Sequence, residues 1–192
     1  MTAPRVDMTG KHVMITGATA GIGEAAAFAL AEMGADLTLV CRNPSKGEAT
    51  LAELRRRSPR VAASMLVGDL GVQADIRRVA AEFLATSKPL HVLFNNAGVV
   101  QLGRSTTVDG LETTFAVNHL GTFLLTTLLL DRLRSSAPSR VVCTASDAHK
   151  FSGGGLDFDD LQSEKGYTTF GAYGRSKLCN ILFAEEIGRA HV

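Results

Sequence analysis

A glycine-rich turn near the start of the chain constrains the fold more than any other feature. The turn, residues 16–23 with the sequence TGATAGIG, lies between a short apolar run at 12–16 and an alanine-rich stretch at 21–33. Glycines at such a junction permit a tight turn and a close approach of backbone to phosphate, and the following helix offers free N–H groups. The turn therefore predicts dinucleotide binding. The absence of Lys-Ser or Lys-Thr after the last glycine excludes a P-loop.

Short apolar runs then alternate with longer amphipathic or charged stretches along the rest of the chain. We expect strands over 12–16, 36–40, 61–67, 90–94 and 140–144, helices over 21–33, 45–57, 73–86, 109–133 and 172–189, and a turn at 152–155. Apolar strands that alternate with helices indicate parallel βαβ units with both faces of the sheet covered. The sequence predicts an α/β fold of the Rossmann type, a doubly wound parallel sheet of order 3-2-1-4-5, in one domain over residues 1–192.

Composition and charge exclude several classes of protein. Lys and Arg number 20 and Asp and Glu 19, so a net charge of +1 gives no electrostatic reason to expect a nucleic-acid partner. Three cysteines without C-x-x-C spacing predict reduced thiols and no metal site. Residues 1–10 carry no apolar signal segment, and the most apolar stretch, 123–130, is shorter than the roughly 18 residues of a membrane span. We therefore expect a cytoplasmic protein with no membrane partner.

The residues around the second expected strand bear on which dinucleotide binds. An NAD site typically has an acidic residue at the end of this strand, where it holds the ribose 2′-hydroxyl. Here Asp36 stands at the start of the strand, and Cys41 and Arg42 stand at its end. A guanidinium can bind a 2′-phosphate in a forked geometry, and we expect no acid to oppose Arg42. This arrangement favours NADP(H) over NAD(H).

A tyrosine and a lysine four positions apart indicate a reaction centre. Tyr173 and Lys177 fall near the start of the last expected helix, where such positions share one face. An ammonium about 5 Å from a tyrosine hydroxyl favours the ionised phenol by roughly 3 kcal/mol at an effective dielectric of about 20. Such a tyrosine can exchange a proton with an alcohol or a carbonyl. Ser146 lies at the carboxyl edge of the predicted sheet, where ligands bind, and its hydroxyl can hydrogen-bond a substrate oxygen.

Motifs along the whole chain occur in an order that resembles the short-chain dehydrogenase/reductase family. They are the turn at 16–23, Asn95-Asn-Ala-Gly98, Asn118, Ser146 and Tyr173-x-x-x-Lys177. The sequence is most similar to the retinol dehydrogenase-like branch, through Cys41-Arg42, Asp69-Leu70, the loop that contains 160–165, and the stretch 176–180.

The resemblance implies a role for each matching residue. Tyr173 would be the general acid/base, and Lys177 would favour its ionised form and hold the nicotinamide ribose. Ser146 would position the carbonyl, and Asn118 would hold a water in a proton relay. His119, beside Asn118 on an apolar helix, is expected to be a packed histidine. The implied cofactor-binding residues are Gly17, Thr19, Ala20, Gly21, Ile22, Gly23, Arg42, Asn43, Asp69, Leu70, Asn95, Ala97, Gly98, Tyr173 and Lys177.

These features together predict an oxidoreductase that transfers a hydride between NADP(H) and a small or lipophilic alcohol/carbonyl substrate. A nucleotide-sugar epimerase also uses a Tyr/Lys pair, although Asn118 and the Asn-Asn-Ala-Gly motif argue against that alternative. A non-catalytic dinucleotide-binding module is the other alternative. Because the helix expected at 109–133 is apolar on more than one side, and because the family often pairs through it, we expect a homodimer or homotetramer.

The end of the chain carries a further expectation. The family continues with more strands, a Pro-Gly turn near the nicotinamide and a segment that covers the substrate, and Val192 resembles the first residue of such a strand. We therefore expect the 192 residues to be an incomplete stretch of a longer enzyme or a weakly active truncation.

Overall fold

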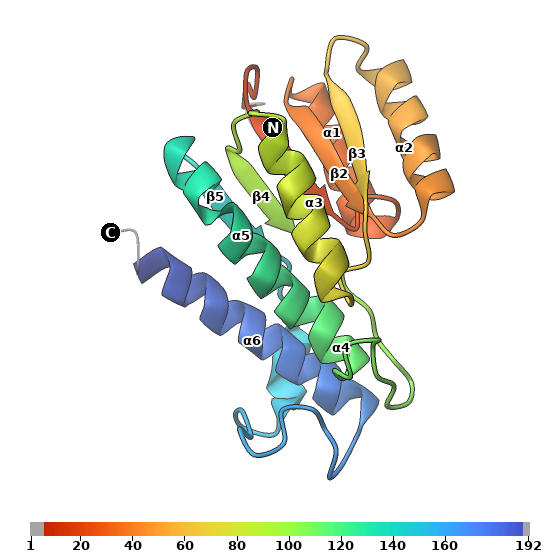
Figure 1. Cartoon of the computed structure of the whole chain (residues 1–192), viewed down its shortest axis with the longest axis vertical. Helices are drawn as coiled ribbons and strands as arrows, with labels where there is room; N and C mark the ends of the chain where they lie inside the picture. The colour runs from red at the N-terminus through yellow and green to blue at the C-terminus, as the bar shows by residue number, and fades with distance from the viewer. Residues whose placement is uncertain (1–5, 190–192) are drawn as a thin grey trace, which may run out of the picture.

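Five parallel strands form the centre of the computed structural model, which describes residues 6–189 (Figure 1). The strands are β1 His12–Thr16, β2 Asp36–Cys41, β3 Ala63–Val67, β4 Val92–Asn95 and β5 Arg140–Cys143. Their order is β3-β2-β1-β4-β5, with Met14 of β1 opposite Thr38 of β2 and Leu93 of β4. The predicted strand order and fold class are confirmed.

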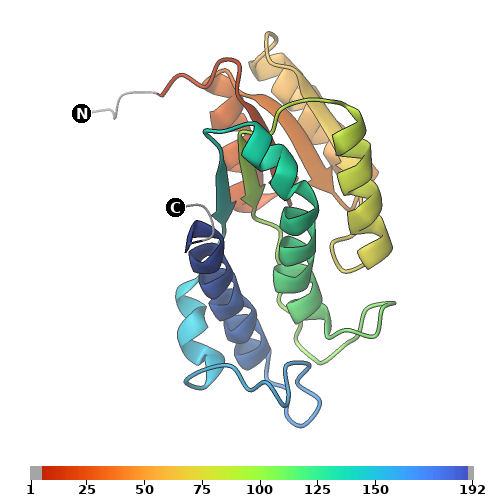
Figure 2. The same ribbon diagram turned by 60° about the vertical axis from the view of Figure 1, so that its left-hand side comes forward.

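Helices cover both faces of this sheet. They are α1 Gly21–Glu32, α2 Pro44–Arg57, α3 Gln73–Ala85, α4 Thr113–Phe115, the π-helical turn η1 Ala116–Leu120, α5 Gly121–Ser135, the 3₁₀ turn η2 Asp147–Ser152 and α6 Thr169–Arg189. Val13 and Ile15 of β1 pack toward α1 and α2, whereas Met14 packs toward α3 and α5. This alternation of side chains divides the core into two halves. Helix α6 lies beside η2, beyond the carboxyl edge of the sheet (Figure 2).

Several predicted boundaries are wrong, and the reasons are local. The helix expected from Asp109 begins instead at Thr113. Gly110 has a φ of +75°, outside the helical range, and the buried carboxylate of Glu112 accepts the backbone N–H groups of Thr114 and Phe115, each at 2.7 Å. A carboxylate in this position caps a helix at its first residues. Strands β3 and β4 begin two residues later than expected, at 63 and 92, and α6 begins three residues earlier, at 169.

The most apolar helix packs one side into the core. Leu125 and Leu129 of α5 are fully buried, whereas Phe123 is 47% exposed. Although the apolar stretch 123–130 alone is shorter than a membrane span, the helical stretch Thr113–Ser135 is long and apolar enough to span a membrane, and 56% of its apolar window is buried within the fold. The expectations of no membrane partner and of a dimer stay predictions. The expected strand start at Val192 lies outside the described residues.

A buried histidine opens the first strand. His12 is 4% exposed, its Nε2 lies 2.8 Å from the Thr38 hydroxyl, and its backbone N–H donates to Nδ1 of His91. Burial lowers the pKa of His12 to about 4, and the nearby positive charge of Lys88 acts in the same direction. The imidazole is therefore neutral in the folded chain at neutral pH.

We expect the free energy of unfolding to fall as the pH is lowered from about 6.5 to about 4. Unfolded histidine binds a proton near pH 6.5 and folded His12 only near pH 4, so the unfolded state binds more protons in this window and acid favours unfolding. This pKa difference corresponds to about 3 kcal/mol, present in full above pH 6.5. Measured by urea unfolding across this pH window, the free energy of unfolding of the unsubstituted chain should fall more steeply with acid than that of His12→Gln, because glutamine does not titrate. Equal slopes would contradict the assignment.

Candidate active site

Backbone packing explains the glycines of the first turn. Gly17 has a φ of +68°, and a Cβ on it would lie 2.8 Å from the Cα of Ala97. A Cβ on Gly23 would lie 2.4 Å from the carbonyl oxygen of Gly17. Helix α1 follows directly, and Ala20 at its N-cap contributes no side-chain hydrogen bond. The turn is therefore tightly closed, and it presents the uncapped N-terminus of a helix.

A pocket of about 470 Å³ lies beside this turn, at the carboxyl ends of β1, β2 and β4. The predicted cofactor residues that line it are Gly17, Thr19, Ala20, Arg42, Asn43, Asp69, Leu70, Ala97 and Gly98. The predicted residues outside its lining are Gly21, Ile22, Gly23, Asn95, Tyr173 and Lys177. Gly23 instead allows the turn to close, and Ile22 is 68% exposed.

The asparagine that contacts the turn is Asn96 rather than Asn95. Asn95 is 3% exposed, and its amide donates to the Thr126 hydroxyl at 2.9 Å, inside the core. Asn96 lines the pocket, and its Nδ2 donates to the carbonyl oxygens of Thr16 and Gly17 at 3.1 and 3.2 Å. Neighbouring residues at a strand end point in opposite directions, and the doubled Asn in the sequence does not reveal which of the two faces the ligand.

Arg42, at the end of β2, lies near an acidic side chain, so the expectation that no acid opposes it is wrong. Nη1 of Arg42 lies 3.6 Å from Oδ2 of Asp69, and the Arg42 side chain is 72% exposed. A second cation that the sequence analysis missed, Lys46, lines the same pocket from the first turn of α2. The side chain of Asn43 caps that helix by accepting the backbone N–H of Lys46 at 3.0 Å. The pocket rim therefore carries two cations and one carboxylate.

The predicted reaction centre assembles around Lys177. This lysine is 3% exposed, and its Nζ donates to the carbonyl oxygen of Thr144 at 2.8 Å. Burial lowers the pKa of Lys177 below its usual value. Nζ lies 5.5 Å from the centre of the Tyr173 ring. A Cβ on Gly98 would lie 3.6 Å from this Nζ and 3.4 Å from Oδ1 of Asn118, so the three predicted residues meet next to the pocket.

The side chain of Asn118 is fully committed to hydrogen bonds in the structure. Its Oδ1 accepts the backbone N–H of Val99 at 2.7 Å, and its Nδ2 donates to the Val99 carbonyl and to the Ser176 hydroxyl, both at 3.0 Å. Asn118 has no exposed surface. It therefore ties the loop after β4 to α6, the helix that carries Tyr173 and Lys177.

Ser146 lies close to α6 through the turn η2. Its hydroxyl accepts the backbone N–H of Ala148 at 3.2 Å and caps η2. Helix α6 meets this turn at Gly174, where a Cβ would lie 2.4 Å from the Ala148 carbonyl oxygen. The glycine next to Tyr173 thus allows the close approach that brings the elements of Ser146 and Tyr173 together.

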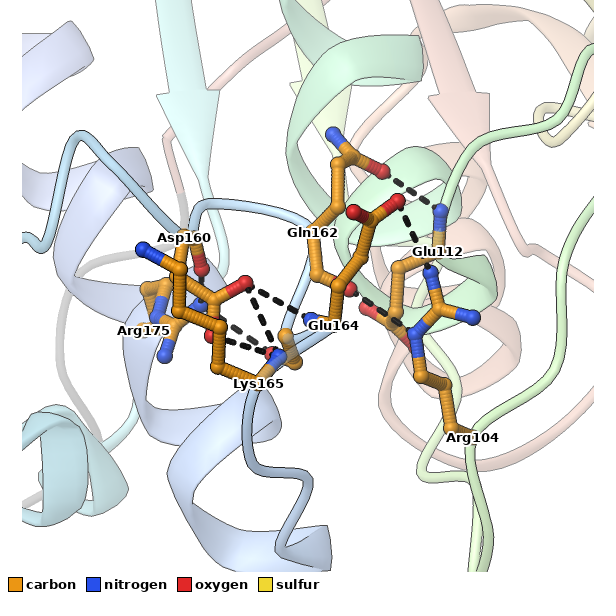
Figure 3. Close-up of polar contacts among 8 residues, drawn as sticks. Arg104, Glu112, Asp160, Gln162, Glu164, Lys165 and Arg175 are labelled. Atoms are coloured by element: carbon orange, nitrogen blue, oxygen red, sulfur yellow. Dashed lines mark hydrogen bonds and ion pairs between the residues drawn. The ribbon is translucent and has the colours of Figure 1, made fainter.

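A network of polar contacts holds the loop before α6 against the segment before α4 (Figure 3). The side chain of Gln162 accepts the backbone N–H of Glu112 at 2.7 Å, and Nε of Arg104 donates to the Gln162 carbonyl at 3.1 Å. From α6, Nη1 of Arg175 donates to the Asp160 carbonyl at 2.6 Å and to the Ser163 hydroxyl at 3.0 Å. We call this network the loop clamp. The sequence marks 160–165 only as part of a loop, so these contacts between distant residues were not predicted.

Exposed apolar side chains surround the same end of the molecule. Phe151 and Phe170 pack with ring centres 6.0 Å apart and are 61% and 63% exposed, and Leu102 and Phe158 are exposed to 90% and 78%. We call these four residues the apolar rim. They come from η2, the start of α6 and the two loops that the clamp joins.

The chain is similar to known proteins along most of its length. The family described as short chain dehydrogenase matches residues 11–156. Retinol dehydrogenase 12 of Mus musculus is 47% identical over 184 residues, which are 96% of this chain and 58% of the relative. Retinol dehydrogenase 11 of Homo sapiens is 46% identical, over 96% of this chain and 57% of the relative. The chain thus spans little more than half the length of these curated relatives.

Solved structures share the fold. A crystal structure of a protein from Mycobacterium paratuberculosis has a TM-score of 0.82 and 34% identity, and the match covers 97% of this chain and 65% of the other. A short-chain dehydrogenase from Sphingobium yanoikuyae in complex with NADPH has a TM-score of 0.75 and 27% identity, covering 94% of this chain and 65% of the other.

Proposed function

Because the chain belongs to the short-chain dehydrogenase family, we propose that it forms the catalytic centre of an oxidoreductase that interconverts an alcohol and a carbonyl with NADP(H). The observation that carries this proposal is the meeting of Lys177, Asn118 and Gly98 beside the pocket, with the Tyr173 ring 5.5 Å from the lysine Nζ. Membership in the family also favours this reaction over the epimerase alternative.

The residues of the pocket fit a dinucleotide. The closed turn at Gly17 allows a phosphate to approach the backbone, and the uncapped N-terminus of α1 offers N–H groups to an anion. Asp69 and Leu70 border the pocket where an adenine would lie, and Arg42 and Lys46 border it near a 2′-phosphate. When bound, the dinucleotide supplies or accepts the hydride.

The side chains around Lys177 would handle the proton. Tyr173 donates a proton to the carbonyl oxygen in reduction and removes it from the alcohol in oxidation. Lys177, held by the Thr144 carbonyl, places a positive charge beside the tyrosine ring and favours its ionised form. Ser146 orients the substrate oxygen. Asn118 holds the loop at Val99 against α6 and so fixes the distance between pocket and reaction centre.

We propose a lipophilic substrate. The apolar rim places four large apolar side chains at the end of the molecule where η2 and α6 carry Ser146 and Tyr173. Two curated relatives, 47% and 46% identical to this chain, are named retinol dehydrogenases, and retinol is a lipophilic alcohol. Exposed apolar surface of this kind favours binding of an apolar partner.

Turnover with a carbonyl panel tests the proposal. The chain and NADPH are mixed with decanal, benzaldehyde or retinal, and loss of NADPH absorbance is followed. We expect more than one NADPH consumed per chain with at least one aldehyde, and the fastest rate with the apolar ones. NADPH binding without consumption would favour the non-catalytic module instead.

Replacement of Arg42 tests the cofactor preference. We expect Arg42→Ala to weaken NADPH binding by roughly 1–3 kcal/mol and NADH binding much less, because only NADPH carries the 2′-phosphate that a guanidinium can bind. Titration calorimetry with both cofactors measures the difference. Arg55→Ala, an exposed arginine on α2 outside the pocket lining, should change neither affinity. An equal loss for both cofactors would remove Arg42 from the 2′-phosphate site.

A further inference from the structure

The backbone at Asn118 departs from a regular helix. Residues Ala116–Leu120 form a π-helical turn between α4 and α5. The carbonyl oxygen of Asn118 accepts Nδ2 of Asn180 from α6 at 3.0 Å and the Thr122 hydroxyl at 3.2 Å. A π turn loosens the ordinary hydrogen-bond ladder and occurs often at functional sites. The buried amide of Asn180, 2% exposed, therefore contacts the main chain of the residue whose side chain holds Val99 and Ser176.

The other side of the Asn180 amide contacts His119. Oδ1 of Asn180 lies 3.1 Å from Nδ1 of His119. A carbonyl oxygen can only accept, so the Asn180 atom that faces the Asn118 carbonyl must be the donor Nδ2, and Oδ1 must face the histidine. Oδ1 also only accepts, so Nδ1 of His119 must carry the proton. The Asn118 carbonyl thus fixes which way the Asn180 amide points, and the imidazole N–H of His119 stabilises that orientation.

Aromatic packing fixes the orientation of His119 itself. Its ring centre lies 5.4 Å from that of Phe115, 6.2 Å from that of Phe183 and 6.4 Å from that of Phe123. Burial lowers the pKa of His119, so the ring is neutral at neutral pH and carries one N–H. Contacts from α4, α5 and α6 hold that N–H toward Asn180.

We propose that His119 and Asn180 are positioning residues for the reaction centre, acting through the chain of hydrogen bonds His119 Nδ1–H to Asn180 Oδ1 and Asn180 Nδ2–H to the Asn118 carbonyl. The proposal rests on the proposed function for its effect on rate. The packing expected of His119 is confirmed by its contacts with three phenylalanine rings, and the contact with Asn180 adds the positioning role. The network sets the register of Asn118 against Ser176 and Lys177 on α6.

Matched substitutions separate positioning from packing. His119→Phe keeps an aromatic ring among the three phenylalanines but removes the donor. We expect kcat with NADPH and the fastest aldehyde of the panel to fall about tenfold, with NADPH affinity almost unchanged. His119→Asn places an amide N–H near the position of the imidazole Nδ1–H, and we expect it to restore kcat to within about threefold of the unsubstituted chain. An unchanged kcat in His119→Phe would overturn the proposal.

A double substitution tests whether His119 acts through Asn180. Asn180→Leu removes the donor to Asn118 at nearly constant volume, and we expect kcat to fall at least as far as in His119→Phe. Combined with His119→Phe, it should cause no further loss, because residues that act in series are not additive. If the kcat losses of the two single variants multiply in the double variant, His119 does not act through Asn180.

Nitrogen NMR tests the geometry without turnover. The imidazole nitrogen shifts of His119 should report the Nδ1–H tautomer, and an Nε2–H tautomer would overturn the assignment. The Val99 amide, which donates to Asn118 Oδ1, should exchange faster with solvent in His119→Phe but not in His119→Asn. If the unsubstituted chain consumes no NADPH, the proposed function fails. The tautomer and the Val99 exchange rate still decide whether this hydrogen-bond chain positions Asn118.

Discussion

Replacing Tyr173 with phenylalanine is expected to lower kcat by at least about 100-fold while NADPH affinity stays nearly the same. The substitution removes only the hydroxyl, so the ring can still pack 5.5 Å from Lys177 Nζ. A positioned proton donor contributes about 100-fold or more to such a reaction, because it transfers its proton to the oxygen on which negative charge develops. Lys177→Met should lower both kcat and NADPH affinity, since this buried lysine is also expected to hold the nicotinamide ribose.

The chain provides a matched control for this experiment. Its only other tyrosine, Tyr167, donates its hydroxyl to the Gln101 carbonyl at 2.7 Å, in the loop before α6. Tyr167→Phe removes an equivalent atom from a structural contact, so kcat should change far less. Steady-state kinetics and NADPH titration on both variants decide the matter. Normal turnover in Tyr173→Phe would remove Tyr173 from the proton transfer.

Replacing Gly23 with alanine is expected to damage both stability and dinucleotide binding. The new Cβ would lie 2.3 Å from Asn96 Nδ2 and 2.4 Å from the Gly17 carbonyl oxygen, and it would break the hydrogen bond between them. Overpacking of this kind typically costs about 1–3 kcal/mol of folding free energy. Opening the turn also moves the backbone that approaches the phosphates, so NADPH affinity should fall at least about tenfold.

A second Gly→Ala substitution in a helix serves as the control, because it adds the same methyl group without the clash expected at Gly23. A Cβ on Gly188, in α6, would meet no atom within 4 Å, so Gly188→Ala should leave binding unchanged and stabilise the fold slightly. Urea unfolding and NADPH titration measure both quantities. Equal behaviour of the two alanine variants would show that the turn tolerates a side chain.

Patterns with one physical solution could be predicted from the sequence. The alternation of apolar strands and helices leaves a parallel sheet as the only way to bury both faces, and the strand order agrees with the prediction. The glycine turn was predicted from its place between a strand and a helix, and in the structure Gly17 and Gly23 occupy positions where a Cβ does not fit. Tyr173 and Lys177 share a helix face through their spacing alone, and the structure places them together.

Contacts between distant residues could not be predicted in the same way. The choice between Asn95 and Asn96 depends on which side of β4 faces the turn, and that follows from the register of three strands. The pairing of Arg42 with Asp69 joins the ends of two strands that are 27 residues apart in the sequence. Within the π turn, the carbonyl of Asn118 accepts an amide N–H that comes from α6. Each of these features requires the assembled sheet.

The loop clamp also determines where this part of the molecule tolerates a change in length. Gly153 and Gly154 have φ angles of +79° and +93°, and the space around Gly153, Gly154 and Gly155 is open. Residues 160–163, by contrast, make the clamp contacts with Arg104, Glu112 and Arg175. Insertions at the glycines would reshape the surface beside the apolar rim while Arg175 still anchors the loop two residues from Tyr173. We therefore expect insertions at these glycines to change the range of substrates without displacing Tyr173.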